Sequence, residues 1–138
     1  MAEKDIATKV RAVLQADTTL TAMLTSSNDI RVSELPVSKV NKQITIRQTL
    51  GRSDSILHAT MSTLFIFVWV KQKEVSEPYK TTAQIMRRVV ALLNRQGRSL
   101  DDSPLEIHQI VKTDGQIMFD EDQERWIGTL VFDVVTNE

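Results

Sequence analysis

An unbroken run of apolar residues lies near the middle of the chain, at residues 64–70 (LFIFVWV). Most of its residues are β-branched or aromatic. A strand with one solvated face would alternate apolar and polar side chains instead. The run therefore predicts the central strand of a sheet, with both of its faces covered. That cover has to come from the rest of this chain or from another subunit.

Helical periodicity predicts an N-terminal helix and a longer main helix. Apolar residues recur on one stripe over 3–15, and Asp17 is placed to cap a short helical turn that follows. The main helix is expected over about 77–95, with Ser76 as its N-cap and Gly97 as its C′ residue. Its stripe is Tyr79, Thr82, Ile85, Met86, Val89, Leu92 and Leu93. This stripe is expected to anchor the main helix on the central strand.

Alternating patterns predict strands on either side of the central one. Residues 43–48 alternate, with Ile44 and Ile46 inward, and are expected to form a half-exposed strand. The polar segment 49–60 then forms the tip of a long β-hairpin at about 43–70. The predicted pairing of this hairpin makes the sheet largely antiparallel.

The C-terminal third predicts two more strands and a short apolar segment. A strand of mixed polarity is expected over 105–112, followed by a turn at 113–115 and the apolar residues 117–119. The last strand, at about 125–135, has two distinct faces. One face carries Trp126, Gly128, Leu130, Phe132 and Val134, and the other carries Ile127, Thr129, Val131, Asp133 and Val135.

The order of elements is helix, strands, helix, strands, which predicts an α+β fold. We expect a mixed, largely antiparallel sheet of four or more strands, with the main helix and the N-terminal helix packed on it. The length of 138 residues suits one domain with a single core, so residues 1–138 are expected to form a single domain.

Composition narrows the possible functions. The net charge is −1, so no basic field favours sequence-independent DNA binding. The absence of cysteine excludes disulfides, thiolate metal sites and a cysteine nucleophile. No apolar run reaches the roughly 18 residues that span a bilayer, and the charged N-terminus is not a secretory signal. The protein is expected to stay in the cytoplasm where it was made.

A search for catalytic, cofactor and metal motifs finds none. His58 and His108 lie far apart in the sequence and are interpreted as surface or packing residues, since a metal site would need further ligands. The acidic segment 120–124 (DEDQE) is not an EF-hand loop, because Arg125 stands where that loop needs glycine. Arg87 and Arg88 are interpreted as a solvated helix face.

Two segments are candidates for contacts with other molecules. Ile56 and Leu57 are apolar residues on the hairpin tip, and they either fold back onto the domain or dock on a neighbouring subunit. The acidic loop is either simply solvated or acts electrostatically in a partner contact or a channel lining. Its four acidic residues are Asp120, Glu121, Asp122 and Glu124.

Several segments in this order carry a family resemblance. They are the strand STLFIFVWVKQ, the helix opening SEPYKTTAQIMRRVVALL, the acidic segment FDEDQERW and the closing strand WIGTLVFDVVTNE. Together they resemble the tail terminator proteins of long-tailed bacteriophages, of the lambda minor tail protein U type. The N-terminal DTTLTAML fits the same plan, whereas residues 25–42 contribute little. The resemblance is one of order, length and pattern rather than of an invariant motif.

The resemblance implies a non-enzymatic virion protein without a cofactor. Terminators of this kind assemble as a ring, typically a hexamer, on the head-proximal end of the tail tube. There they stop tube polymerisation and present the surface that joins the head. The implied partners are further copies of the chain, the tube protein, a head-completion or neck protein and, in a contractile tail, the sheath protein. Such a protein is assembled in the host cytoplasm and resides in the virion, with DNA only as passing cargo.

The pattern of residues agrees with this implication but leaves alternatives open. A closed ring built from one heterologous contact would cover the central strand and the apolar hairpin tip. If DNA passes through the ring, an acidic lining formed by the 120–124 loop would repel its phosphates. The alternatives are another phage neck or head–tail connector protein, a small-molecule-binding regulatory domain, and a small enzyme using carboxylates.

Overall fold

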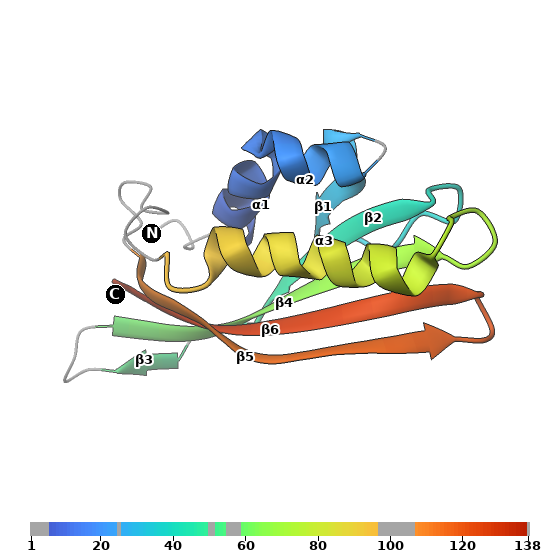
Figure 1. Ribbon diagram of the computed structural model, residues 1–138. Helices are drawn as coiled ribbons and strands as arrows, with labels where there is room; N and C mark the ends of the chain where they lie inside the picture. The colour runs from blue at the N-terminus through green and yellow to red at the C-terminus, as the bar shows by residue number, and fades with distance from the viewer. Residues whose placement is uncertain (1–5, 25, 50–51, 55–58, 97–106, 138) are drawn as a thin grey trace.

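The protein folds as a mixed sheet with its helices on one side (Figure 1). The computed structural model describes residues 6–24, 26–49, 52–54, 59–96 and 107–137. In chain order the elements are α1 (Ile6–Ala16), α2 (Thr18–Met23), the 3-10 turn η1 (Ser27–Asp29), β1 (Ile30–Val32), β2 (Lys42–Gln48), β3 (Arg52–Asp54), β4 (Ala59–Lys71), α3 (Pro78–Leu93), β5 (Ile107–Asp120) and β6 (Arg125–Asn137).

The predicted central strand is β4. The strand order is β1-β2-β4-β6-β5, and β3 pairs with the first residues of β4. Strand β1 runs parallel to β2, and the other described pairings are antiparallel. Strands β2 and β4 form the predicted hairpin, with Lys42 opposite Val70 and Gln48 opposite Leu64. These features confirm the predicted α+β fold.

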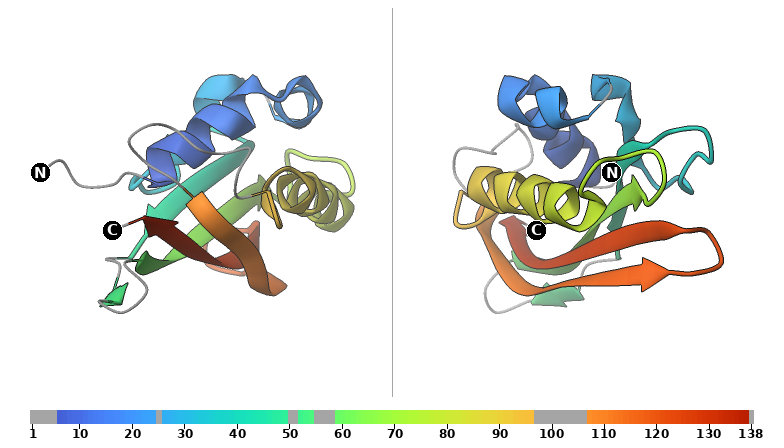
Figure 2. Two further views of the ribbon diagram at one scale, coloured as in Figure 1. Left: turned by 90° about the vertical axis from the view of Figure 1, so that its left-hand side faces the viewer. Right: turned by 45° about the vertical axis from the view of Figure 1, so that its right-hand side comes forward.

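The core lies between the helices and one face of the sheet (Figure 2). Every second residue of β4 from Leu64 to Val70 is fully buried there, because strand side chains point alternately to the two faces. Helix α3 contributes most of its predicted stripe to this core. Its buried members are Thr82, Ile85, Met86, Val89 and Leu93. Tyr79 differs from the prediction, since it is 55% exposed and packs edge-on against Trp126.

The N-terminus of α3 differs from the prediction by one residue. The helix begins at Pro78, and its N-cap is Glu77, which has a left-handed backbone (φ 50°) and no capping side-chain hydrogen bond. Ser76 therefore lies outside the helix and is not its cap. The Ser76 carbonyl instead accepts a hydrogen bond from the Thr81 hydroxyl.

The C-terminus of α3 also comes earlier than predicted. Asn94 is the C-cap, and Arg95 has the positive φ of 61° that was expected at Gly97. The Arg95 backbone N–H donates to the Ile110 carbonyl at 2.7 Å. This bond to β5 fixes the helix end through a tertiary contact, which the local sequence does not reveal.

The predicted turn at 113–115 is wrong, because β5 is one continuous strand. It pairs with β6 from Ile107 to Asp120. Lys112 lies opposite Phe132 and Asp114 opposite Val131, so Thr113 is the extra residue of a β-bulge. The long pairing with β6 therefore overrides the local turn preference of a Thr-Asp-Gly sequence.

Asp17 joins the N-terminal helices to α3. Its carboxylate accepts the Leu20 backbone N–H at 2.8 Å, which confirms it as the N-cap of α2. The same carboxylate accepts two hydrogen bonds from the Arg88 guanidinium, at 2.7 and 2.9 Å. Arg88 is therefore not part of a solvated helix face, and its hydrogen bonds lower the pKa of Asp17.

We expect stability to fall in the order wild type, Asp17→Asn, Asp17→Ala. Asparagine keeps the cap and loses the charge, whereas alanine loses both, and loss of a cap alone costs about 1 kcal/mol. Because the pKa of Asp17 is lowered on folding, its ionised form stabilises the protein above the ordinary pKa of 3.8. That contribution is lost as the pH falls through the folded-state pKa. In urea unfolding, the gap between wild type and Asp17→Asn should narrow from pH 7 to pH 3, and a constant gap would contradict this.

Candidate subunit interface

The second face of β4 carries large apolar side chains that are only partly covered. Phe65, Phe67 and Trp69 alternate with the buried residues and point away from the helices, and all three are half-buried. Within the described part of the chain, helices cover β4 on one face only, and the second face has local cover at just one corner. The other side is available for a different molecule.

Strand β6 extends this apolar surface. Ile127 lies opposite Trp69, and Val131 lies opposite Phe65, whose ring stacks on that of Phe67 with centroids 6.3 Å apart. We call this surface the open face. It comprises Phe65, Phe67, Trp69, Ile127, Thr129, Val131 and Val135, all half-buried. A contiguous, partly exposed apolar surface of this kind is typical of a site of interaction with another molecule.

The segment 33–40 covers one corner of the same side of the sheet. The Gln43 side chain donates to the Val37 carbonyl and accepts the Val37 N–H, both at 2.9 Å. Gln43 and Thr45 are consequently buried, so β2 is not the half-exposed strand that its alternation predicted. The Trp69 indole N–H donates to the Thr45 hydroxyl at 2.9 Å, which marks the border of the covered corner.

Acidic residues stand at the β5–β6 side of the open face. Asp133 lies opposite Val111 of β5, and Asp114 lies opposite Val131. Both aspartates are exposed. The open face therefore combines an aromatic centre with a negatively charged margin on this side.

The four acidic residues of the predicted loop lie in or next to the exposed turn between β5 and β6. The Asp120 carboxylate accepts the backbone N–H of Asp122 at 3.0 Å, so it stabilises the turn. Glu124 forms an ion pair with Lys73 at 3.0 Å. Glu121 and Asp122 are exposed, and their carboxylates have no partner among the described residues. Asp120 and Glu124 thus stabilise the local structure, whereas Glu121 and Asp122 carry unpaired charge at the surface.

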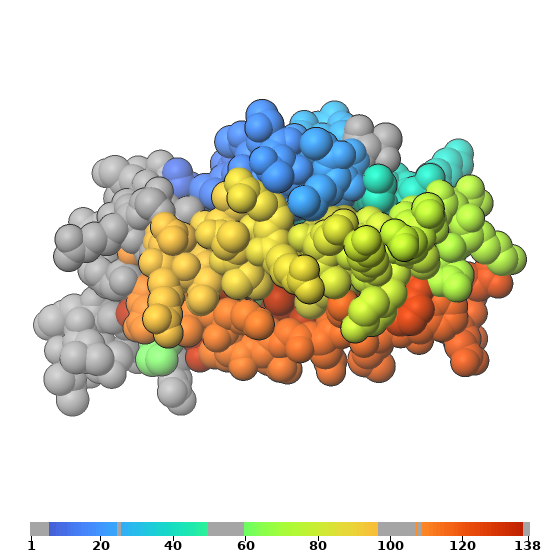
Figure 3. All heavy atoms as spheres, viewed as in Figure 1, coloured from blue at the N-terminus to red at the C-terminus, as the bar shows by residue number. Residues whose placement is uncertain are grey.

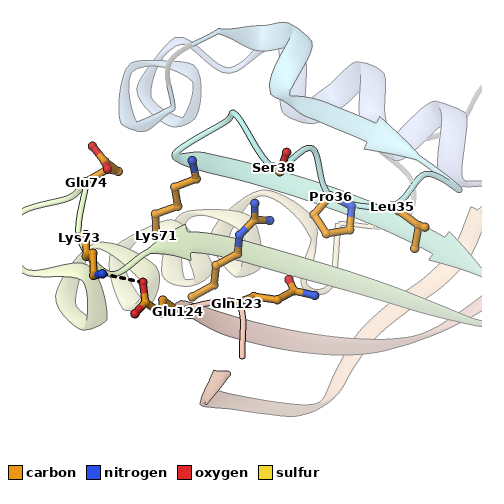
Figure 4. Close-up of a pocket in the computed structure, with 9 residues that line it drawn as sticks. Leu35, Pro36, Ser38, Lys71, Lys73, Glu74, Gln123 and Glu124 are labelled. Atoms are coloured by element: carbon orange, nitrogen blue, oxygen red, sulfur yellow. Dashed lines mark ion pairs between the residues drawn. The ribbon is translucent and has the colours of Figure 1, made fainter. Parts of the chain in front are cut away.

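A hollow of about 540 Å³ lies beside this turn (Figure 4). It is lined by Leu35, Pro36, Ser38, Lys71, Lys73, Glu74, Gln123, Glu124 and Arg125. Figure 4 shows Lys73 and Glu124 facing each other across their ion pair. Ligand pockets are mostly apolar and enclosing, whereas this lining is mainly charged side chains of both signs. Such a surface suits contact with another protein better than enclosure of a small molecule.

Part of the hairpin tip and both histidine side chains are not among the described parts of the structure. Ile56, Leu57 and His58 lie outside the described residues, as does the side chain of His108. Across the described ranges, no three histidine or carboxylate side chains gather in a way that could hold a metal ion. No helix in those ranges is long and apolar enough to cross a membrane.

The fold is shared with a chain from the virion of a native gene transfer agent particle. The match has a TM-score of 0.77, covers 96% of this chain and 95% of that chain, and shows 16% sequence identity. At this identity the similarity establishes a common fold and no more. The sequence matches no protein-family model, and no curated protein matches it significantly.

Adjacent residues on the two faces of β4 should respond differently to truncation. Ile66→Ala should cost about 2–5 kcal/mol, because it leaves a cavity beneath the helices. Phe67→Ala should cost less in dilute solution, because the Phe67 ring is already partly solvated there. Urea unfolding at low protein concentration measures both. Equal costs would show that the open face is part of the monomer's core, contrary to our assignment.

Proposed function

We propose that this protein is a structural virion protein without enzymatic activity, and specifically a phage tail terminator. Its ring would cap the head-proximal end of the tail tube, stop tube polymerisation and provide the surface that joins the head. The observation that carries this proposal is the open face. A chain with an aromatic sheet surface and charged, shallow hollows is built to contact other proteins.

The shared fold supports the choice of a virion protein. The similarity to a chain of a gene transfer agent virion extends over nearly the whole of both chains. The sequence resemblance to tail terminators covers most of the chain, with little contribution from residues 25–42, and it includes β4, α3 and β6. One similarity lies in the backbone fold and the other in the sequence pattern.

A closed ring explains how such a protein can end polymerisation. In a ring built from one heterologous contact, every apolar surface finds a partner and no copy is left to propagate the assembly. We propose that other copies of this chain cover the open face, in a hexamer as the resemblance implies. Ile56 and Leu57 on the hairpin tip would add to the contact between subunits.

The acidic turn fits a position at the lumen or at a neighbouring protein. Glu121 and Asp122 carry the unpaired charge of this turn and would repel the phosphates of passing DNA. DNA is cargo in this proposal and not a ligand. The protein partners are the tail tube protein, a head-completion or neck protein and, if the tail is contractile, the sheath protein.

A neighbouring neck or head–tail connector protein is the second candidate. The similarity to a virion chain favours it as much as it favours a terminator, because the similarity does not specify a position in the particle. The two candidates differ in what happens to tail length when the protein is missing.

Inactivating the coding sequence in its phage should therefore distinguish them. For a terminator, electron microscopy of the lysate should show unjoined heads and tail tubes of excessive length, and added wild-type protein should form rings on tube ends. Tubes of normal length beside unjoined heads would instead assign the protein to the neck. Normal, infectious particles would contradict both positions.

The acidic turn can be tested separately. Glu121→Lys with Asp122→Lys should reduce the yield of infectious phage, because the reversed charge would attract DNA phosphates. The matched control, Glu121→Gln with Asp122→Asn, keeps the side-chain shapes and should have a smaller effect. Asp120 and Glu124 are left intact because they serve the turn itself. An unchanged phage yield with the reversed charges would show that the turn neither lines the lumen nor contacts a partner.

A further inference from the structure

A second apolar surface lies on the helix side of the sheet, between α3 and the edge strand β5. It is a groove of about 430 Å³, lined by Tyr79, Ala83, Met86, Arg87, Val90, Lys112, Gly115, Gln116, Ile117 and Leu130. Figure 3 views this boundary directly, with α3 in yellow to green above β5 in orange. The groove exists because α3 packs more over β4 and β6 than over β5, which leaves the helix-side face of β5 partly open between Lys112 and Ile117.

An aromatic cluster near Tyr79 adds exposed apolar area at one end of the groove. Trp126 contacts Tyr79 edge-on at a centroid distance of 5.3 Å and Phe119 at 5.0 Å. Tyr79 is 55% exposed and Phe119 is 38% exposed. Partly exposed aromatic residues of this kind are enriched where proteins contact each other.

The charges of this groove are opposite to those of the β5–β6 margin of the open face. Arg87 and Lys112 line the groove and are exposed, and none of the described residues that line it is acidic. The β5–β6 margin of the open face instead carries exposed Asp114 and Asp133, while exposed Arg47, opposite Phe65, stands at its β2 margin. Placing the β5–β6 margin of an open face on a groove would therefore pair opposite charges.

We propose that the open face of one copy seats on the α3–β5 groove of the next copy, and that this head-to-tail contact builds the ring. The inference rests on the ring assembly proposed above and specifies its interface. The two surfaces lie on opposite sides of the sheet, so each copy offers one surface to each neighbour. Such a heterologous contact continues from copy to copy until it closes, unlike a two-fold contact, which stops at a dimer.

Mixing two assembly-defective variants tests this contact. Phe67→Asp should disable the open face and Val90→Asp the groove, each weakening self-association on the order of 100-fold, as expected for a central interface residue. Each variant alone should sediment as a monomer. Mixed in equal amounts, they should form a one-to-one dimer that grows no further, because the mixture retains one intact surface of each kind. Ala91→Asp, at the adjacent exposed position of α3, is the control and should assemble like the wild type.

If the apolar variants fail to fold, a charge exchange at two exposed positions provides a second test of the same contact. Asp133→Lys and Arg87→Glu should each weaken assembly, and the double variant should recover it. Normal assembly of Val90→Asp, a mixture that stays monomeric, or a wild type that never self-associates would each overturn the head-to-tail contact. The terminator proposal is judged separately, from tail length in the phage that lacks the protein.

Discussion

Strand β4 places apolar side chains on both faces of the sheet, while the helices cover only one of them. The helix-side residues of β4 are fully buried, and α3 packs so closely above the sheet that a Cβ at Gly128 would overlap the Met86 side chain. The opposite face repeats the apolar character with Phe65, Phe67 and Trp69. Among the described elements, no helix lies on that side (Figure 1). This imbalance between apolar strand surface and available cover is the constraint on which the proposed assembly depends.

The local cover on the second face is limited and specific. The segment 33–40 is fixed there through Gln43, and the Arg125 guanidinium also donates to the Val37 carbonyl at 3.3 Å. These bonds bury the β2 corner and leave the aromatic centre beside β6 open. The cover therefore ends at a defined border, and the surface beyond it has a definite shape and charge. A surface of this kind can select a partner, whereas a loosely covered core would only lower stability.

The acidic turn shows how one cluster can combine structural and surface functions. Asp120 stabilises the turn through backbone N–H groups, and Glu124 pairs with Lys73. Exposed ion pairs of the latter kind contribute little to stability. The free charge of the cluster thus belongs to Glu121 and Asp122, which a count of acidic residues in the sequence could not distinguish from their neighbours.

The sequence by itself determined the features that depend on periodicity and on local hydrogen bonds. The run at 64–70 predicts β4, the stripe of α3 predicts the residues that are buried apart from Tyr79 and Leu92, and the position of Asp17 predicts an N-cap. Tertiary structure decided the rest, because those features need partners far away in the chain. Arg88 reaches Asp17 across 71 positions, and pairing with β6 converts the expected turn at 113–115 into a bulge. The open face was only half predictable, since the sequence shows that β4 is apolar on both sides. Which side stays uncovered depends on where the helices pack in three dimensions.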